Sequence, residues 1–285
     1  MAGPTVSVAP SVDVALYFAR VGYTGSEAPT SETLQALVTA HLRHIPFENL
    51  DPLMGIPVGD LSATALFDKM VRRRRGGYCF EHNGLMRYVL SDLGFDVQAL
   101  SARVVWMRED GLDGPPPPQT HELLSVRIPG DVQRYLVDVG FGGQTLTAPI
   151  RFDVGTVQQT PHEPYRLSTH RGQYVLEVQI ADQWRPLYMF DDQPRPQIDL
   201  QLASWYVSTY PDSNFVVGLT VSLITPEARW NMRGRNLAVH HLRGDTERIR
   251  FDNAAQVLDA LMNRFGIDVG GIGDVHARIT EVLDS

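Results

Sequence analysis

The chain has 285 residues, of which 43% are hydrophobic, and a formal net charge of -8. A chain of this length buries roughly three quarters of its unfolded surface, which allows a sizeable core in one or two domains. The acidic balance argues against nucleic-acid partners, whose binding proteins are usually basic, and against attraction to anionic membranes. There is no apolar run of roughly 18 residues and no secretory-type N-terminus, so we expect a cytoplasmic protein without membrane partners.

The first third of the sequence predicts helices. Apolar residues recur at helical spacing over residues 12–21, 32–44, 63–73 and 79–93. Ser31 is the predicted N-cap of the second helix, and Pro46 should end it. Gly94 is expected to close the fourth helix.

The middle of the sequence predicts strands rich in β-branched and apolar residues. They cover residues 97–107, 122–128, 135–139, 165–169, 173–180 and 184–190. The four consecutive prolines at 115–118 are expected in a loop. Short strands at this spacing favour a small antiparallel barrel or sandwich.

The last third predicts a mixed α/β segment after a connecting helix at 200–208. Strands are expected at 215–224, 236–242 and 247–251, followed by helices at 254–265 and 275–283. The order of helices, strands and a mixed tail predicts an α+β protein.

Cys79 is the only cysteine, which excludes an intramolecular disulfide and a cysteine-rich metal site. A lone cysteine with histidines elsewhere is a candidate nucleophile, although a buried structural thiol is the commoner fate of a free cysteine. Gly76 and Gly77 precede it, and a helix is predicted to begin at it. The N–H groups at a helix start stabilise a thiolate and can bind an oxyanion, so we expect a lowered pKa for this thiol.

A nucleophilic cysteine needs a base and a group that orients the base. His121 follows the proline-rich loop, and Asp138 interrupts an apolar strand, where an unpaired charge is costly. Neighbouring strands could bring the two side chains together as the base and its partner. His121 could equally be an ordinary strand-end histidine, and Asp138 could cap a turn or pair with an arginine.

Four segments together resemble the motifs of the arylamine N-acetyltransferases, in the same order along the chain. They are HIPFENL at 44–50, RGGYCFEHN at 75–83, THELL at 120–124 and VDVGFG at 137–142. The resemblance implies a catalytic triad of Cys79, His121 and Asp138, as in cysteine proteases. It also implies a ping-pong transfer from acetyl-CoA to arylamines, arylhydrazines or N-hydroxyarylamines through an acetyl-cysteine thioester.

The fold implied by the resemblance has four parts. They are an N-terminal helical bundle at 1–95, a central antiparallel β-barrel at 96–192, a helical connector at 193–214 and a C-terminal α/β lid at 215–285. The cysteine lies in the first part, and the histidine and aspartate lie in the second. No metal and no permanently bound cofactor are implied, because acetyl-CoA is a cosubstrate.

Further residues match substrate-binding positions of the family. Phe47, Phe141 and Phe215 are predicted to line a flat acceptor pocket, although core packing is the commoner role of a Phe. Predicted CoA contacts are Gly140 and Gly142, which permit close approach of the backbone, together with Trp230, Arg233 and Arg235.

Other polar residues receive structural interpretations. Residues 72–75 are expected to form a solvated helix end in which Arg75 can pair with Glu48 or another acid, and His82 is expected to be structural. His240 and His241 have no partner at metal-ligand spacing.

Three other functions remain open at this point. A thiol hydrolase could use the same triad, an amide synthase of the same fold could close a macrolactam, and a non-catalytic protein could bind a small molecule. The physiological acceptor, the preferred acyl chain and the oligomeric state are not predicted.

Overall fold

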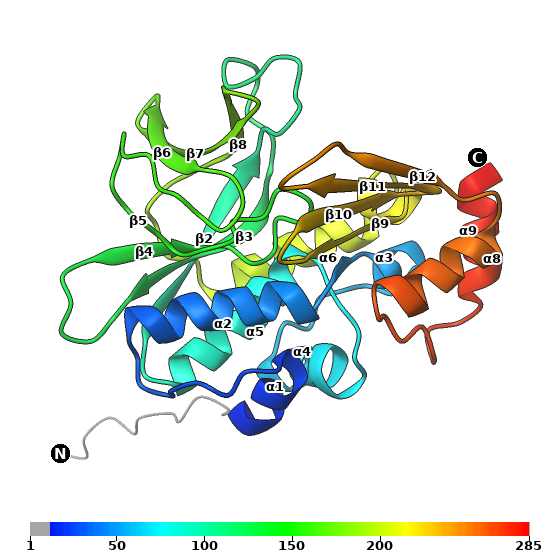
Figure 1. Cartoon of the computed structure of the whole chain (residues 1–285), viewed down its shortest axis with the longest axis horizontal. Helices are drawn as coiled ribbons and strands as arrows, with labels where there is room; N and C mark the ends of the chain where they lie inside the picture. The colour runs from blue at the N-terminus through cyan, green and yellow to red at the C-terminus, as the bar shows by residue number, and fades with distance from the viewer. Residues whose placement is uncertain (1–11, 285) are drawn as a thin grey trace.

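The computed structural model describes residues 12–284, and the first part of this range is helical (Figure 1). Helices gather on one side of the barrel and carry the glycine-rich turn that leads into Cys79. The elements are α1 Val14–Val21, α2 Ser31–His44, α3 Leu50–Leu53, α4 Ala63–Phe67, the π-helical continuation η1 Asp68–Arg72, and α5 Cys79–Asp92. The helical prediction is confirmed, with the third helix ending in a π-helical turn.

The start of α2 differs from the prediction by one residue. Thr30 has an extended backbone, and its hydroxyl accepts a hydrogen bond from the Thr33 N–H at 3.2 Å. Thr30 is therefore the N-cap, and Ser31 is the first helical residue. The helix ends at His44, before Pro46, as predicted.

The middle of the chain forms a nearly closed antiparallel barrel of seven strands. In sheet order they run β5-β4-β3-β2-β8-β7-β6, and a bridge from Val154 to Leu167 brings the two edges together. The strands are β2 Asp96–Val104, β3 Gln119–Arg127, β4 Arg134–Val137, β5 Ile150–Arg151, β6 Tyr165–His170, β7 Gln173–Ile180 and β8 Gln183–Phe190. The two-residue strand β5 is the one that the sequence did not predict.

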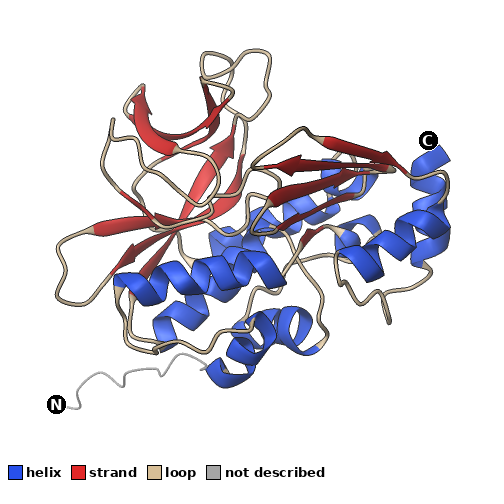
Figure 2. Cartoon of the chain, viewed as in Figure 1, coloured by secondary structure: helices blue, strands red, loops and turns tan. Residues whose placement is uncertain are grey.

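The C-terminal segment is a second sheet flanked by helices (Figure 2). Its strand order is β1-β9-β10-β11-β12, so the short strand β1 from the helical part forms one edge. The elements are β1 Phe47–Glu48, α6 Gln197–Thr209, α7 Asn214–Val217, β9 Thr220–Ile224, β10 Ala228–Arg233, β11 Asn236–His241, β12 Glu247–Arg250, α8 Ala254–Asp259, the π-helical continuation η2 Ala260–Arg264, and α9 Val275–Asp284.

The predicted strand at 215–224 is wrong in its first half. The Ser213 hydroxyl accepts a hydrogen bond from the Phe215 N–H at 3.3 Å and starts the short helix α7. The strand begins only at Thr220. The sequence also missed β10, whose apolar positions are interrupted by arginines at 229 and 233.

The α+β class is confirmed, with a helical part, a barrel and an α/β part. The division at 95/96 falls at the start of β2. By contrast, Phe47 pairs with Ser222 of β9, and Leu50 packs in the apolar cluster of the C-terminal segment. We retain the four-part division as a proposal, with the C-terminal sheet drawing one edge from the helical part.

Two buried contacts hold the C-terminal segment against the rest. On β10, Arg229 donates to both carboxylate oxygens of Glu163, which precedes the barrel strand β6, at 2.6 to 3.1 Å. Asn49 donates to the carbonyls of Phe215 and Gly218, both at 2.7 Å. The first contact joins the last segment to the barrel, and the second joins it to the helical part.

Within residues 12–284, no helix combines the length and the apolar character needed to cross a membrane.

A buried charge network supports the turn before Cys79. Arg75 is 1% exposed and contacts Glu48 at 2.8 Å and Asp51 at 2.9 Å. Lys69 extends the network by contacting Asp51 and Glu81, each at 2.6 Å. The expectation of a solvated helix end is therefore wrong for Arg75, whereas its predicted tie to Glu48 is confirmed.

Replacing Arg75 with Met should reduce the free energy of unfolding by about 3–5 kcal/mol, because the carboxylate of Glu48 is then buried without its partner. Arg72 offers a matched control, since its side chain is 55% exposed and contacts Asp68 only at 4.0 Å. Arg72→Met should cost less than about 1 kcal/mol. Urea denaturation of the three proteins measures both effects. Equal losses would contradict the importance of the buried network.

Candidate active site

Cys79 is the first residue of α5, and its side chain reaches the barrel strand β3. The residue is 4% exposed, and its Sγ lies 3.6 Å from the carbonyl oxygen of Thr120. The backbone N–H of Glu122 also donates to this sulfur. The sulfur therefore contacts the backbone on both sides of His121, as expected if a helix start faces that strand.

The predicted lowering of the Cys79 pKa is wrong for the isolated thiol. Burial raises the pKa of this thiol, and the nearby Asp138 and Glu122 carboxyls raise it further. Hydrogen bonds from the backbone N–H groups of Glu122 and Phe80 act in the opposite direction and do not outweigh burial. A thiolate at this position consequently needs a positive partner.

His121 and Asp138 are in direct contact. His121 lies within β3, Asp138 directly follows the neighbouring strand β4, and the His121 Nε2 is 2.7 Å from the Asp138 Oδ2. A carboxylate oxygen accepts, so the Nε2 carries the proton. In the neutral imidazole, Nδ1 is then the unprotonated nitrogen.

Asp138 is a buried carboxylate that protein groups hold in its charged form. Burial alone would raise its pKa, but His121, the amide of Asn83 and the backbone N–H of Gly140 outweigh burial and hold the pKa below its usual range. Asn83 and Gly140 each donate to the Oδ1 at 3.0 Å. Both carboxylate oxygens of Asp138 therefore accept hydrogen bonds.

The sequence did not identify Asn83 as part of the site. Its side-chain amide also donates to the Glu122 carbonyl at 2.6 Å and accepts from the Val139 N–H at 3.0 Å. The available signal was its position, four residues after Cys79 and so on the same face of α5. Asn83 joins this helix to the two strands that carry His121 and Asp138.

Tyr188 of β8 was also missed. Its ring lies 4.9 Å from that of His121 and 5.5 Å from that of Phe141. Burial, together with the charge of Asp138, raises the pKa of Tyr188, so its hydroxyl keeps its proton. Only the folded barrel brings β8 beside β2, one strand away from β3, which explains why no local signal marked this residue.

The three predicted aromatic residues lie in two adjoining groups. Phe47 and Phe215 have ring centroids 6.0 Å apart, and Phe141 packs edge-on against His121 at 5.3 Å. Gly142 links the groups, because a Cβ at this position would lie 3.5 Å from the Phe47 ring.

The predicted CoA residues are not all brought together. Gly140 packs against Cys79, since a Cβ there would lie 2.8 Å from the Cys79 Cα. Trp230 packs edge-on against Phe265 within the C-terminal segment, and Arg235 donates to the carbonyls of Asp252 and Leu283. Arg233 has an exposed side chain at the end of β10.

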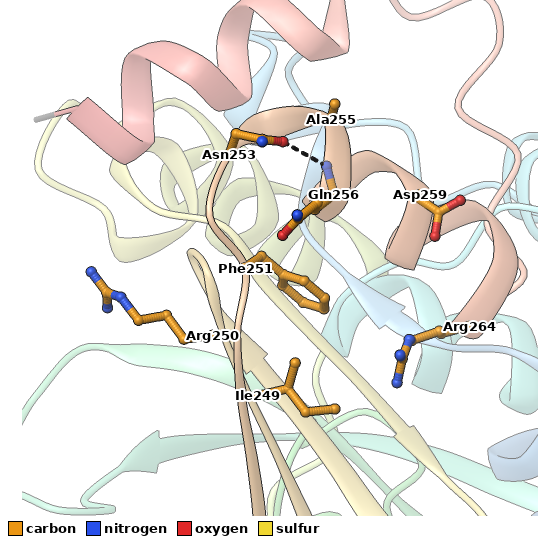
Figure 3. Close-up of a pocket in the computed structure, with 8 residues that line it drawn as sticks. All are labelled: Ile249, Arg250, Phe251, Asn253, Ala255, Gln256, Asp259 and Arg264. Carbon is orange, nitrogen blue, oxygen red and sulfur yellow. Dashed lines mark hydrogen bonds between the residues drawn. The ribbon is translucent and has the colours of Figure 1, made fainter.

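Two hollows differ in their relation to these residues. A small cavity lies beside the aromatic groups and is lined by Leu42, Ile45, Phe47, His82, Val139, Gly142, Thr145, Ser222, Leu223 and Ile224. A depression of about 590 Å³ lies in the C-terminal segment instead, with Arg250 and Arg264 on opposite sides of Phe251 (Figure 3). The depression shares no lining residue with the predicted site, whereas the small cavity is lined by Phe47 and Gly142 of that site.

Across residues 12–284, no cluster of three or more histidine, cysteine or acidic side chains has the arrangement of a metal site.

Comparison with known proteins gives matches along nearly the whole chain. Residues 30–274 match the model of a family described as N-acetyltransferase. An arylamine N-acetyltransferase of Mycolicibacterium smegmatis is 62% identical over 277 residues, covering 96% of this chain and all of the relative. A Salmonella typhimurium protein named arylamine N-acetyltransferase / N-hydroxyarylamine O-acetyltransferase is 35% identical, covering 93% of this chain and 91% of the relative.

Solved structures give the same picture. The arylamine N-acetyltransferase of M. smegmatis superposes with a TM-score of 0.93, covering 96% of this chain and all of that chain at 62% identity. The Mycobacterium marinum arylamine N-acetyltransferase in complex with CoA has a TM-score of 0.91 at 53% identity, covering 95% of this chain and 99% of that chain.

Glu122 follows His121 and is a buried acid without a hydrogen-bond partner for either carboxyl oxygen among the described residues. Its closest cation is Arg87, whose Nε lies 3.8 Å from the Oε1. Burial raises the pKa of Glu122 to about 8, and Arg87 only partly offsets this. At neutral pH the folded protein therefore holds Glu122 mainly as the uncharged acid.

The raised pKa predicts a pH dependence of stability. Between the ordinary glutamate pKa and about 8, the unfolded chain has lost a proton that the folded chain keeps, so stability falls as pH rises. Glu122→Gln has no such proton. Its free energy of unfolding, relative to that of the unsubstituted protein, should therefore rise by up to about 1.4 kcal/mol per pH unit across that window. Urea denaturation from pH 5 to 8 measures the difference. A constant difference between the two proteins would contradict a neutral Glu122.

Proposed function

We propose a catalytic mechanism for this chain, which belongs to the arylamine N-acetyltransferase family: an acetyl group moves from acetyl-CoA to Cys79 and then to an aromatic amine. The observation that carries the proposal is the contact of the Cys79 sulfur with the backbone on both sides of His121, whose ring is fixed by Asp138. This arrangement supplies a nucleophile, a base and an orienting carboxylate.

In the first half-reaction, His121 takes the proton of the Cys79 thiol at its Nδ1. The sulfur then attacks the carbonyl carbon of acetyl-CoA, and N–H groups at the start of α5 stabilise the oxyanion. When the carbon–sulfur bond to CoA breaks, the protonated His121 returns its proton to the CoA thiolate. The products are the acetyl-cysteine thioester and free CoA.

In the second half-reaction, the nitrogen of an arylamine attacks the thioester carbonyl. His121 removes a proton from this nitrogen, and Cys79 leaves and regains a proton. An aromatic amine is weakly basic and largely uncharged at neutral pH, so base assistance suffices for attack. An arylhydrazine can react in the same way through its terminal nitrogen.

The acceptor pocket that we propose is formed by Phe47, Phe141 and Phe215. Aromatic side chains give the flat apolar surface that an aryl ring needs. An N-hydroxyarylamine would place its hydroxyl oxygen where the amine nitrogen otherwise lies, and the name of the Salmonella relative includes such an O-acetyl transfer.

For CoA, we propose that Gly140 and Gly142 allow its thiol arm to approach Cys79 and that Arg233 meets a phosphate. Support comes from the position of Gly140 directly beside Cys79 and from the exposure of Arg233, although the space at Gly140 itself is filled by the backbone of Cys79 and the amide of Asn83. Trp230 and Arg235 remain candidates with weaker support, because each already has a partner within the C-terminal segment.

Mixing the protein with acetyl-CoA should add one acetyl group to its intact mass. Adding an arylamine should then remove that group and yield the N-acetylated amine, because the thioester lies on the pathway. Cys79→Ala should gain no mass, and neither should the protein after alkylation of Cys79. An acetyl group that persists in Cys79→Ala would contradict the nucleophile.

Product analysis separates this mechanism from the other functions that use the same triad. A thiol hydrolase would release free acetate at a rate that added amine leaves unchanged. A macrolactam-forming amide synthase would turn over long amino-acyl thioesters and leave simple arylamines untouched. Transfer to arylamine with little free acetate is the expected result.

A further inference from the structure

A chain of buried hydrogen bonds leads from the first helix to the peptide that precedes Phe47. The Tyr17 hydroxyl lies 3.0 Å from the His41 Nδ1, and the His41 Nε2 lies 2.8 Å from the His82 Nδ1. The His82 Nε2 lies 3.2 Å from the Pro46 carbonyl oxygen. The three side chains are at most 1% exposed, so water cannot replace these partners.

The chemistry of the ends fixes the direction of every bond in this chain. A carbonyl oxygen only accepts, so His82 must donate from its Nε2 to Pro46. In the neutral ring its Nδ1 then accepts from the Nε2–H of His41, and the Nδ1 of His41 accepts from the Tyr17 hydroxyl. Each donor and each acceptor is used once when both imidazoles are neutral.

The surroundings favour these neutral rings. Burial lowers the pKa of His82 to about 4, and burial, His82 and Arg20 together lower the pKa of His41. Lys69 also disfavours a charge on His82, whereas the carbonyls of Pro46 and Gly77 and the charge of Asp138 act in the opposite direction and do not outweigh burial. A second proton on either ring would turn an acceptor nitrogen into a donor and break the chain.

His82 connects the nucleophile helix with Phe47. It lies three residues after Cys79 on α5, and its ring is nearly parallel to that of Phe47, with an angle of 9° and centroids 6.2 Å apart. Both side chains line the small cavity beside the aromatic groups. The Pro46 carbonyl is also tightly enclosed, because a Cβ at Gly76 would lie 2.0 Å from its oxygen.

We propose that His82 is a positioning residue that fixes the Phe47 wall of the acceptor pocket, and that the chain Tyr17–His41–His82–Pro46 holds it in place. The ring of His82 sets the orientation of the Phe47 ring, and its Nε2–H sets the peptide that carries Phe47. This role rests on the proposed function, in which Phe47 contacts the aryl acceptor. It predicts an effect on acceptor binding and little effect on acetylation of Cys79.

Steady-state and single-turnover kinetics of His82→Phe test the proposal. The substituted ring preserves stacking and removes both hydrogen bonds, so KM for an arylamine should rise about 3- to 10-fold, the equivalent of one net hydrogen bond. Acetylation of Cys79 by acetyl-CoA in a single turnover should stay within about 2-fold of the unsubstituted rate. His41→Phe should raise the same KM by less, because His82 can still donate to Pro46.

Val38→Ala is the control for a general loss of stability. Val38 is a buried residue of α2, the helix that carries His41, and it has no part in the hydrogen-bond chain. This variant should melt at a lower temperature with an unchanged acceptor KM. An unchanged KM in His82→Phe, or an equal rise in Val38→Ala, would overturn the proposal.

The ring nitrogens of the unsubstituted protein give a second test that needs no variant and no activity. Nitrogen-15 NMR shifts should show both His41 and His82 as neutral rings protonated at Nε2 and bare at Nδ1. A ring protonated at Nδ1 would overturn the hydrogen-bond chain even if acetyl transfer were observed. If acetyl transfer were absent while these tautomers were present, the proposed function would be contradicted and the hydrogen-bond chain would be confirmed.

Discussion

Asp138 is a negative charge with 1% exposure, and the site is arranged around keeping it charged. Water cannot solvate it, so its partners come from three segments: His121 on β3, Asn83 on α5 and the backbone N–H of Gly140. An unpaired charge at this depth would cost several kcal/mol. The same contacts that satisfy Asp138 therefore fix the tautomer of His121 and hold the helix start of Cys79 against the barrel.

Burial also changes how Cys79, the proposed nucleophile, must be activated. A helix start favours a thiolate, but at Cys79 the loss of solvent dominates, and the charge of Asp138 adds to it. In the proposed mechanism, transfer of the thiol proton to His121 pairs the thiolate with an imidazolium and avoids an isolated buried anion. The first helices affect the proposed site indirectly, because the Tyr17–His41–His82 hydrogen-bond chain ends at the peptide beside Phe47.

Local sequence patterns predicted the elements that surround the candidate site. They are the helix that starts at Cys79, a strand that in the structure extends back from 122 to include His121, and the strand that directly precedes Asp138. They failed where a contact with a residue distant in the sequence determines the local structure. Residues 214–217 form a helix that Asn49 holds through two carbonyls, although their apolar run favours a strand. On β10, Arg229 is buried because Glu163 lies opposite, a pairing across 66 residues. The raised pKa of Cys79 likewise depends on tertiary burial, which no local motif records.

The central claim is that His121, oriented by Asp138, ionises Cys79. The most direct measurement is the rate of Cys79 alkylation by iodoacetamide at mildly acidic pH in the unsubstituted protein and in Asp138→Asn. Our account predicts at least about 10-fold slower alkylation in the variant, because a weaker imidazolium raises the thiol pKa by a unit or more. If the helix start alone ionised the thiol, removal of the Asp138 charge would leave alkylation unchanged or faster, and that result would contradict the account.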